Sequence, residues 1–133
     1  MKLHLLDTNI ASHIMRRDDP IVLTKLGELE TENVAISAVT KGELIYGLAK
    51  RGNLPVLMQT IRGFLQTVTV LPWTEETAET YGTLKATCMA RGIGLGALDM
   101  MIAAHAVSLG ATLVSRDKAF GHIGDELKVV DWS

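Results

Sequence analysis

The chain has 133 residues, of which 47% are hydrophobic, and it carries a formal net charge of -2. This length is typical of one domain, and the apolar content is sufficient for a core and argues against disorder. The charge excludes a generally basic surface for polyanions, so a nucleic acid would have to be held by local basic patches or by bound metal.

Cysteine use and hydropathy indicate the compartment. Cys88 is the single cysteine and cannot form an internal disulfide, so we expect a reducing cytoplasm. The apolar run at 3–6 stops at Asp7, too early for a signal peptide, and no segment approaches the roughly 18 apolar residues that cross a bilayer. Repeats and linkers are absent from the sequence, so we expect residues 1–133 to form a single soluble domain without membrane association.

The first half of the chain alternates between strand and helix patterns. We expect strands at 3–6 and 34–36, helices at 10–15, 20–29 and 54–65, and a third helix that follows Ser37 and ends near residue 50. Pro20 suits the first position of its helix, and Lys50-Arg51-Gly52 suits a helix end. Helical spacing places Tyr46 on or near the buried side of the third helix.

The second half continues the alternation. We expect strands at 68–71, 111–115 and 127–130, a long helix from Thr74, and a helix at 98–109 after a glycine-rich loop. The apolar stripe of the long helix should include Tyr81, Leu84, Cys88 and Met89. The pattern predicts an α/β fold in three layers, with a five-stranded, mainly parallel sheet flanked by helices.

Four carboxylates, Asp7, Glu43, Asp99 and Asp117, lie where a predicted strand ends or a helix begins. In a doubly wound sheet such positions meet at the carboxyl ends of the strands. Acids held together repel one another, so either their pKa values rise or a cation keeps them ionised. Mg²⁺ and Mn²⁺ prefer oxygen ligands, and two such ions can drive phosphodiester hydrolysis. The sequence therefore predicts a divalent-metal site.

Each acid also has a structural alternative. Asp7 and Asp117 could cap the helical segments that follow them, and Asp99 could complement a helix dipole. Arg116 could neutralise Asp117 as an ordinary ion pair. Glu43 matches the T-x-x-E capping box that begins at Thr40, unless its helix starts at Ser37 or Ala38.

Other functions remain open at this point. Asp7 at the end of the first strand could be the phosphoryl acceptor of a phosphatase or receiver-like domain, although Asn9 stands where such phosphatases have a second Asp. The acids could also form a non-catalytic module that recruits a basic partner. The four histidines have no zinc spacing, which favours structural roles. Basic residues that could follow an RNA backbone are Arg16, Arg17, Lys41, Lys50 and Arg51.

Several segments together carry a family resemblance. They are Leu6-Asp7-Thr8-Asn9, Ser37-Ala38-Val39-Thr40-Lys41-Gly42-Glu43-Leu44, Asp99-Met100-Met101-Ile102-Ala103, and Ser115-Arg116-Asp117 with the closing Asp131-Trp132-Ser133. On these segments, which extend over essentially the whole chain, it resembles the PIN-domain ribonucleases. The group it resembles most is the VapC toxins of bacterial type II toxin–antitoxin pairs.

The resemblance implies an Mg²⁺- or Mn²⁺-dependent endoribonuclease that arrests translation when free of its antitoxin. Its substrate would be RNA, with transfer RNA and the initiator species as candidates. Asp7, Glu43 and Asp99 match the family's most constant acids, as catalytic residues and metal ligands, and Asp117 matches a more variable fourth. Asn9 and Ser115, with Thr8 as a weaker candidate, match polar positions that support the acids or metal-bound water.

The resemblance also implies protein partners. A VapB antitoxin would bind the chain and direct a basic side chain toward the acidic site, and a homodimer would form within a larger toxin–antitoxin assembly. The apolar helices at 21–29 and 54–65 could contribute to such contacts, but core packing is their ordinary role.

Overall fold

The computed structural model describes residues 2–133, and within them one five-stranded sheet has the order β3-β2-β1-β4-β5. Every adjacent pair of strands is parallel. The strands are β1 (His4–Leu6), β2 (Val34–Ser37), β3 (Thr69–Leu71), β4 (Thr112–Val114) and β5 (Lys128–Val130). The predicted five-stranded parallel sheet is confirmed.

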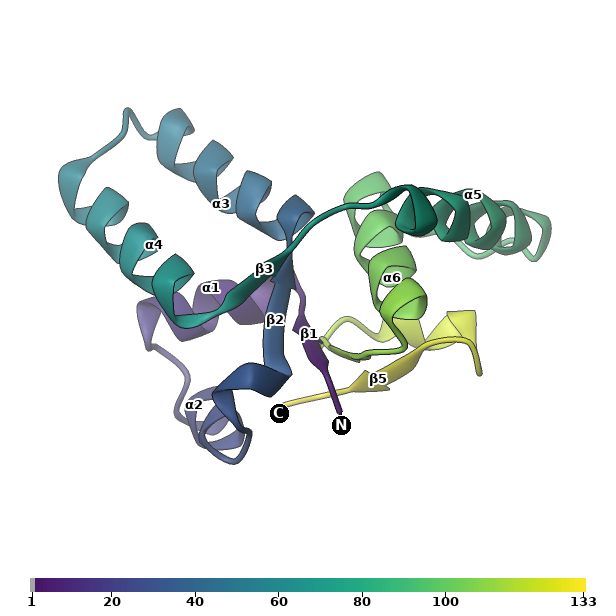
Figure 1. The fold of residues 1–133 in the computed structure, drawn as a ribbon, viewed down its shortest axis with the longest axis horizontal. Coiled ribbons are helices and arrows are strands. Elements are labelled where there is room, and N and C mark those ends of the chain that lie inside the picture. The colour runs from purple at the N-terminus through teal and green to yellow at the C-terminus, as the bar shows by residue number, and fades with distance from the viewer. Residues whose placement is uncertain (1) are drawn as a thin grey trace.

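Helices connect these strands and cover both faces of the sheet (Figure 1). They are α1 (Thr8–Arg16), α2 (Pro20–Gly27), α3 (Ala38–Lys50), α4 (Pro55–Thr67), α5 (Glu75–Ala90) and α6 (Ala97–Leu109), with short 3-10 helices η1 (Thr31–Asn33) and η2 (Lys118–Ile123). None of the helices in this part of the chain is both long and apolar enough to cross a bilayer.

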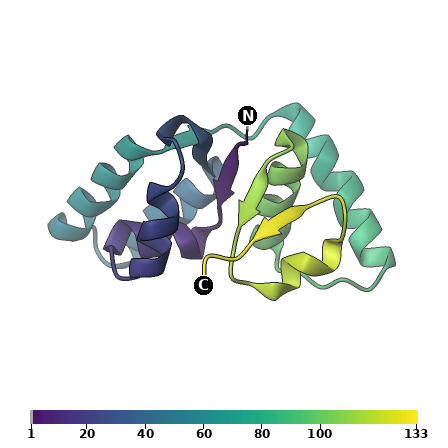
Figure 2. The ribbon, with the colours of Figure 1, turned by 90° about the horizontal axis from the view of Figure 1, so that it is seen from below.

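The core has two halves because successive residues of a strand point to opposite faces. Leu5 belongs to a buried cluster with residues of α5, α6 and η2. Leu6 belongs to a second cluster with residues of α1 to α4. Figure 2 shows the two groups of helices on either side of the sheet. The strands are therefore apolar on both faces, as expected for a parallel sheet.

Side-chain caps mark the starts of several helices, among them the predicted cap Asp7. The Asp7 carboxylate accepts a hydrogen bond from the Ile10 amide at 2.8 Å, and Ser37 Oγ accepts one from the Val39 amide at 3.1 Å. Pro20 opens α2 behind the N-cap Asp19. Side-chain acceptors satisfy amides that the first turn leaves free, so these residues fix where the helices begin.

Two predicted buried positions are wrong. Tyr46 is 58% exposed, because the buried residues of α3 are Thr40, Leu44 and Leu48, and a residue two positions from Leu44 points to the opposite side of the helix. Met89 is 68% exposed, because the buried stripe of α5 passes through Cys88 and its neighbour is turned away.

Candidate active site

The sheet topology brings distant acids to one edge. From β1 the sheet extends through β2 and β3 on one side and through β4 and β5 on the other, so the switch point lies between β1 and β4. Open parallel sheets bind ligands at the carboxyl ends of the strands at such a point. Asp7 directly follows β1, and Asp117 follows β4 by three residues. Helix α6 leads into the start of β4, so its N-terminal turn, with Asp99, lies at the same edge.

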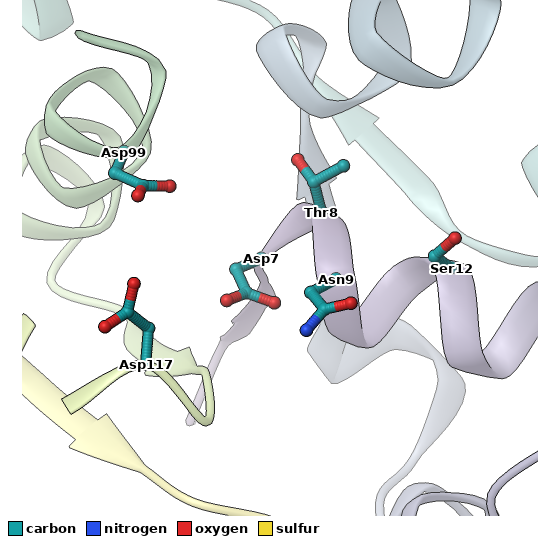
Figure 3. Close-up of a pocket in the computed structure, with 6 residues that line it drawn as sticks. All are labelled: Asp7, Thr8, Asn9, Ser12, Asp99 and Asp117. Carbon is teal, nitrogen blue, oxygen red and sulfur yellow. The ribbon is translucent and has the colours of Figure 1, made fainter. Parts of the chain in front are cut away.

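These three acids line one pocket of about 380 Å³. Figure 3 shows their carboxylates turned toward a shared space, Asp7 from the start of α1, Asp99 from α6 and Asp117 from the segment after β4. Thr8, Asn9 and Ser12 complete the lining. The structure thus gathers three of the four predicted acids.

Asp7 is the most buried of the three and is only 6% exposed. Burial raises the pKa of its carboxyl, and the nearby negative charge of Asp117 raises it further. Hydrogen bonds from the Ser115 side chain and the Ile10 amide act in the opposite direction. Asp7 therefore caps α1 and also presents a carboxylate to the pocket, so the structural and functional interpretations of this residue are compatible.

Asp99 is half-buried in the first turn of α6. Burial raises the pKa of its carboxyl, and the charges of Asp117 and then Asp7 raise it further. The three acids therefore repel one another, which is the electrostatic condition that a bound cation relieves.

Asp117 is exposed and lies on irregular backbone between β4 and η2. Its carboxylate accepts a hydrogen bond from the Ala119 amide at 2.9 Å, and its own amide donates to Ser115 Oγ at 3.0 Å. The alternative in which Arg116 neutralises Asp117 is wrong, because the Arg116 guanidinium pairs with Asp19 at 2.6 Å.

Glu43 lies apart from the other acids. It is half-buried and lines a neighbouring groove of about 540 Å³, which shares Thr8 and Ser12 with the acid pocket. Because α3 begins at Ala38, Glu43 is beyond the first turn and cannot form the capping box that starts at Thr40. The structure therefore excludes the capping-box alternative. Glu43 lies in the groove next to the acid pocket, and Thr8 and Ser12 line both.

The donor chemistry fits a hard cation. Within residues 2–133, no group of three or more His, Cys, Asp or Glu side chains is arranged as a ready-made metal cage. Mg²⁺ does not require one, because it usually keeps several waters and takes one or two carboxylates together with substrate phosphates. Asp7, Asp99 and Asp117 supply oxygen donors at a pocket open to water and substrate, and these residues would hold the ion.

The predicted supporting residues have distinct contacts. Thr8 Oγ1 lies 3.1 Å from Oγ1 of the buried Thr40, which joins α1 to α3. Asn9 is exposed at the pocket, whereas Ser115 is buried and hydrogen bonds to Asp7.

The sequence interpretation missed Ser12, which lines both the pocket and the groove. Its position one helical turn after Thr8 is the signal that could have identified it.

A buried hydrogen bond behind the site was also missed. His105 Nδ1 lies 2.7 Å from Ser37 Oγ, and the ring packs edge-on against Trp73 with centroids 5.6 Å apart. Burial lowers the pKa of His105, and a hydrogen bond to the Pro72 carbonyl partly opposes that shift. This histidine has a structural role, as predicted, and it links the helix that carries Asp99 to the start of the helix that carries Glu43.

Comparison with known proteins supports the same interpretation. The family model for the PIN domain matches residues 4–126. Ribonuclease VapC2 of Haemophilus influenzae is 32% identical over 117 residues, 88% of each chain, and the tRNA(fMet)-specific endonuclease VapC of Shigella flexneri is 33% identical over 131 residues, 97% of each chain. The structure of DNA-bound VapBC from Salmonella typhimurium superposes with a TM-score of 0.90 at 27% identity over 100% of both chains. The chain therefore belongs to the PIN-domain family and, within it, to the VapC ribonucleases.

Proposed function

We propose that this VapC ribonuclease is the toxin of a type II toxin–antitoxin pair and cleaves RNA endonucleolytically with Mg²⁺ or Mn²⁺ held by Asp7, Asp99 and Asp117. One observation carries the proposal: three carboxylates from separate parts of the chain line a single pocket, where burial and then their mutual charges raise the pKa values of Asp7 and Asp99. Acids that repel one another at a crevice are stabilised by a cation.

The residues of the site have separate tasks in this mechanism. When bound, the cation would supply electrostatic stabilisation of the phosphate and a more acidic water. Asp7, fixed by the Ile10 amide, is the rigid donor of the set. Asp99 and Asp117 approach from the other side of the pocket. Glu43 lies on the groove side, where a carboxylate can accept a proton from water that approaches the phosphate.

The groove beside the pocket supports RNA as the substrate. Arg16, Arg17 and Arg51 line it together with apolar residues that include Leu44 and Leu57. Arginine pairs with phosphate oxygens in fixed geometry, and apolar surface can accept a base. A strand whose scissile phosphate lies at the acids could continue into this groove. Because the Shigella flexneri relative is named as tRNA(fMet)-specific, transfer RNA, with the initiator species first, is the proposed target.

The proposed partners follow the family. The Salmonella typhimurium structure is a VapBC complex, so we propose a cognate VapB-type antitoxin for this chain. A basic side chain of that antitoxin would be drawn to the acidic pocket by charge complementarity. We further propose a homodimer within the toxin–antitoxin assembly, in the cytoplasm where transfer RNA is found.

The decisive experiment combines activity with target identification. RNA 5′ ends are sequenced after induced expression of the wild type beside Asp7→Asn, and purified protein is incubated with initiator transfer RNA in EDTA and after Mn²⁺ is added back. The proposal expects new 5′ ends with the wild type alone, no cleavage in EDTA and recovery with Mn²⁺. Cleavage that is unaffected by EDTA or by Asp7→Asn would overturn it.

Two further measurements address the other functions considered above. A non-catalytic acidic module predicts no saturable Mn²⁺ binding in calorimetry. A phosphoryl-acceptor domain predicts a mass increase on Asp7 after incubation with a phosphoryl donor. The proposed nuclease predicts saturable Mn²⁺ binding and no covalent adduct.

A further inference from the structure

Of the three acids in the pocket, Asp117 depends most on contacts made by its neighbouring residues for its position. Asp7 caps helix α1 and Asp99 lies in the first turn of helix α6, whereas Asp117 follows the end of β4 on extended backbone and caps only the short 3-10 helix η2. Its own hydrogen bonds, to Ala119 and Ser115, are local to that segment. Contacts from Ser115 and Arg116 to the rest of the molecule, the hydrogen bond between Ser115 and Asp7 among them, therefore determine where the Asp117 carboxylate lies relative to Asp7.

Arg116 makes two of these contacts. Its Nη2 lies 2.6 Å from Asp19 Oδ2 and donates to the Trp132 carbonyl at 2.9 Å. The other oxygen of Asp19 accepts from the Ile21 and Val22 amides at the start of α2. One guanidinium thus joins the Asp117 segment to the beginning of α2 and to the C-terminal tail.

The two segments that Arg116 contacts, the C-terminal tail and the start of α2, are both held in place by the rest of the protein. Trp132 is only 6% exposed and packs in the buried cluster that contains Leu6 and Val114. The tail returns toward the side of the sheet that carries α1 and α2 (Figure 2). The Ser115 amide also bonds to the Val130 carbonyl at 3.0 Å, just before the tail. The tail and α2 are held by packing, so they can fix Arg116.

The arrangement also separates charges. In extended backbone, alternate side chains point the same way, which lets Ser115 and Asp117 serve the pocket while Arg116 points away from it. Asp19 compensates the guanidinium charge, so Arg116 does not neutralise the adjacent Asp117. If Asp19 were removed, the guanidinium would be free to pair with Asp117 and compete with a cation.

From these contacts we infer that Arg116 is a positioning residue for the active site: its bonds to Asp19 and the Trp132 carbonyl hold Ser115 and Asp117 where a divalent cation can be bound. The inference rests on the proposed metal-dependent function. It concerns a residue that touches neither the metal pocket nor the groove, since neither lining includes Arg116.

The test measures Mn²⁺ affinity of the full chain by calorimetry, together with thermal unfolding in EDTA and the Mn²⁺ concentration at half-maximal cleavage. Groups that orient metal ligands typically contribute 10- to 100-fold to affinity. We expect Arg116→Gln and Asp19→Asn each to weaken Mn²⁺ binding by about tenfold or more, with cleavage largely recovered at high Mn²⁺. Asn remains a good N-cap, so Asp19→Asn preserves the start of α2.

Two further variants separate positioning from general stability. Arg116→Lys keeps the charge but loses the planar geometry that serves two acceptors, and it should give an intermediate affinity. Arg91→Gln is the matched control, because Arg91 also donates to two carbonyls, those of Ile123 and His122, at the far end of η2. It should lower stability without weakening Mn²⁺ binding.

The double variant Asp19→Asn with Arg116→Gln sharpens the result. If the freed guanidinium competes for Asp117, the double variant binds Mn²⁺ more tightly than Asp19→Asn alone. The inference is overturned if Arg116→Gln and Asp19→Asn bind Mn²⁺ like the wild type, or if Arg91→Gln weakens binding equally. A wild type that binds no Mn²⁺ would instead contradict the proposed metal dependence, so the two failures are distinguishable.

Discussion

Thr8 Oγ1 lies 3.1 Å from Thr40 Oγ1, and this hydrogen bond connects the two helices that begin at the ends of β1 and β2. Thr8 directly follows Asp7 and lines both the acid pocket and the groove, while Thr40 is fully buried one turn before Glu43. The bond therefore links the positions of Asp7 and Glu43, which do not share a pocket.

Thr40→Val should lower the free energy of unfolding by about 1 kcal/mol, because a net hydrogen bond contributes roughly that amount. It should also reduce cleavage, because α1 and α3 lose their polar contact beside the site. Thr40→Ser keeps the hydroxyl and is expected to cleave like the wild type. Chemical denaturation and steady-state kinetics check both, and equal kinetics for Val and Ser would show that the bond is unimportant for activity.

Asp99→Asn should abolish cleavage while stabilising the metal-free protein at neutral pH. The pKa of Asp99 is raised above the ordinary value of 3.8, so the folded state binds its proton more tightly than the unfolded state. The contribution of Asp99 to the free energy of unfolding is therefore favourable at low pH. It is lost as the pH rises through the pKa that Asp99 has in the folded protein. The advantage of Asp99→Asn over the wild type should therefore shrink as the pH falls toward 4.

Thermal unfolding in EDTA between pH 4 and 8 measures this difference. Asp125→Asn is the control, because Asp125 is exposed and lies outside the lining of the pocket, yet its loss changes the net charge equally. If Asp125→Asn stabilises the protein as much as Asp99→Asn does, the effect comes from the change in net charge and not from the environment of Asp99.

Glu43→Gln should separate catalysis from metal binding. Because Glu43 lines the groove and not the three-acid pocket, we expect loss of cleavage by more than about 100-fold, within the range of general acid–base contributions, with Mn²⁺ affinity close to that of the wild type. Asp7→Asn should lose both. Calorimetry with Mn²⁺ decides, and a loss of binding in Glu43→Gln equal to that in Asp7→Asn would make Glu43 a direct ligand.

Arg51→Gln should weaken RNA binding and leave the chemical step intact. Arg51 is exposed and lines the groove, so its loss removes a phosphate partner. The expected result is a higher KM, an unchanged kcat, and a salt dependence of log K reduced by about 0.7 for single-stranded substrate. Arg62→Gln, an exposed site on α4 outside the groove lining, is the control. If Arg51→Gln and Arg62→Gln raise the KM equally, the arginines attract RNA only through their general positive charge and the groove has no special role.

His105→Phe should destabilise the protein by about 1–3 kcal/mol, because the buried Ser37 hydroxyl loses its hydrogen bond to the ring and keeps only the one from the Val39 amide. The pKa of His105 is lowered below its ordinary value of 6.5, so the unfolded state binds the proton more tightly. Wild-type stability from this group is present above pH 6.5 and falls as the pH decreases. The difference between wild type and variant should narrow on acidification, and thermal unfolding across pH 5 to 8 tests this.

Much of the fold could be predicted from local patterns. The apolar runs of β1 and β2, the cap Asp7, and Pro20 at the first position of α2 act through contacts within a few residues, so the sequence displays them directly. The same holds for the three carboxylates at the carboxyl edge, because a parallel sheet places every strand end on one side.

Other features depended on the tertiary structure. Tyr46 fits a helical apolar period, but only the packing direction of α3 decides that it faces outward. The partners of Arg116 and His105, Asp19 and Ser37, are distant in sequence. Such partners cannot be read from local periodicity, since any surface acid or hydroxyl is an equally good partner until the chain is folded.

The amino-acid sequence alone determined the order of strands and helices, the location of the acids at their junctions and the family to which the chain belongs. Only the folded structure decided that Asp7, Asp99 and Asp117 share a pocket while Glu43 lies in the adjoining groove. The physical reason is that capping and periodicity act over a few residues, whereas repulsion between carboxylates and the shape of a pocket depend on distances across the sheet.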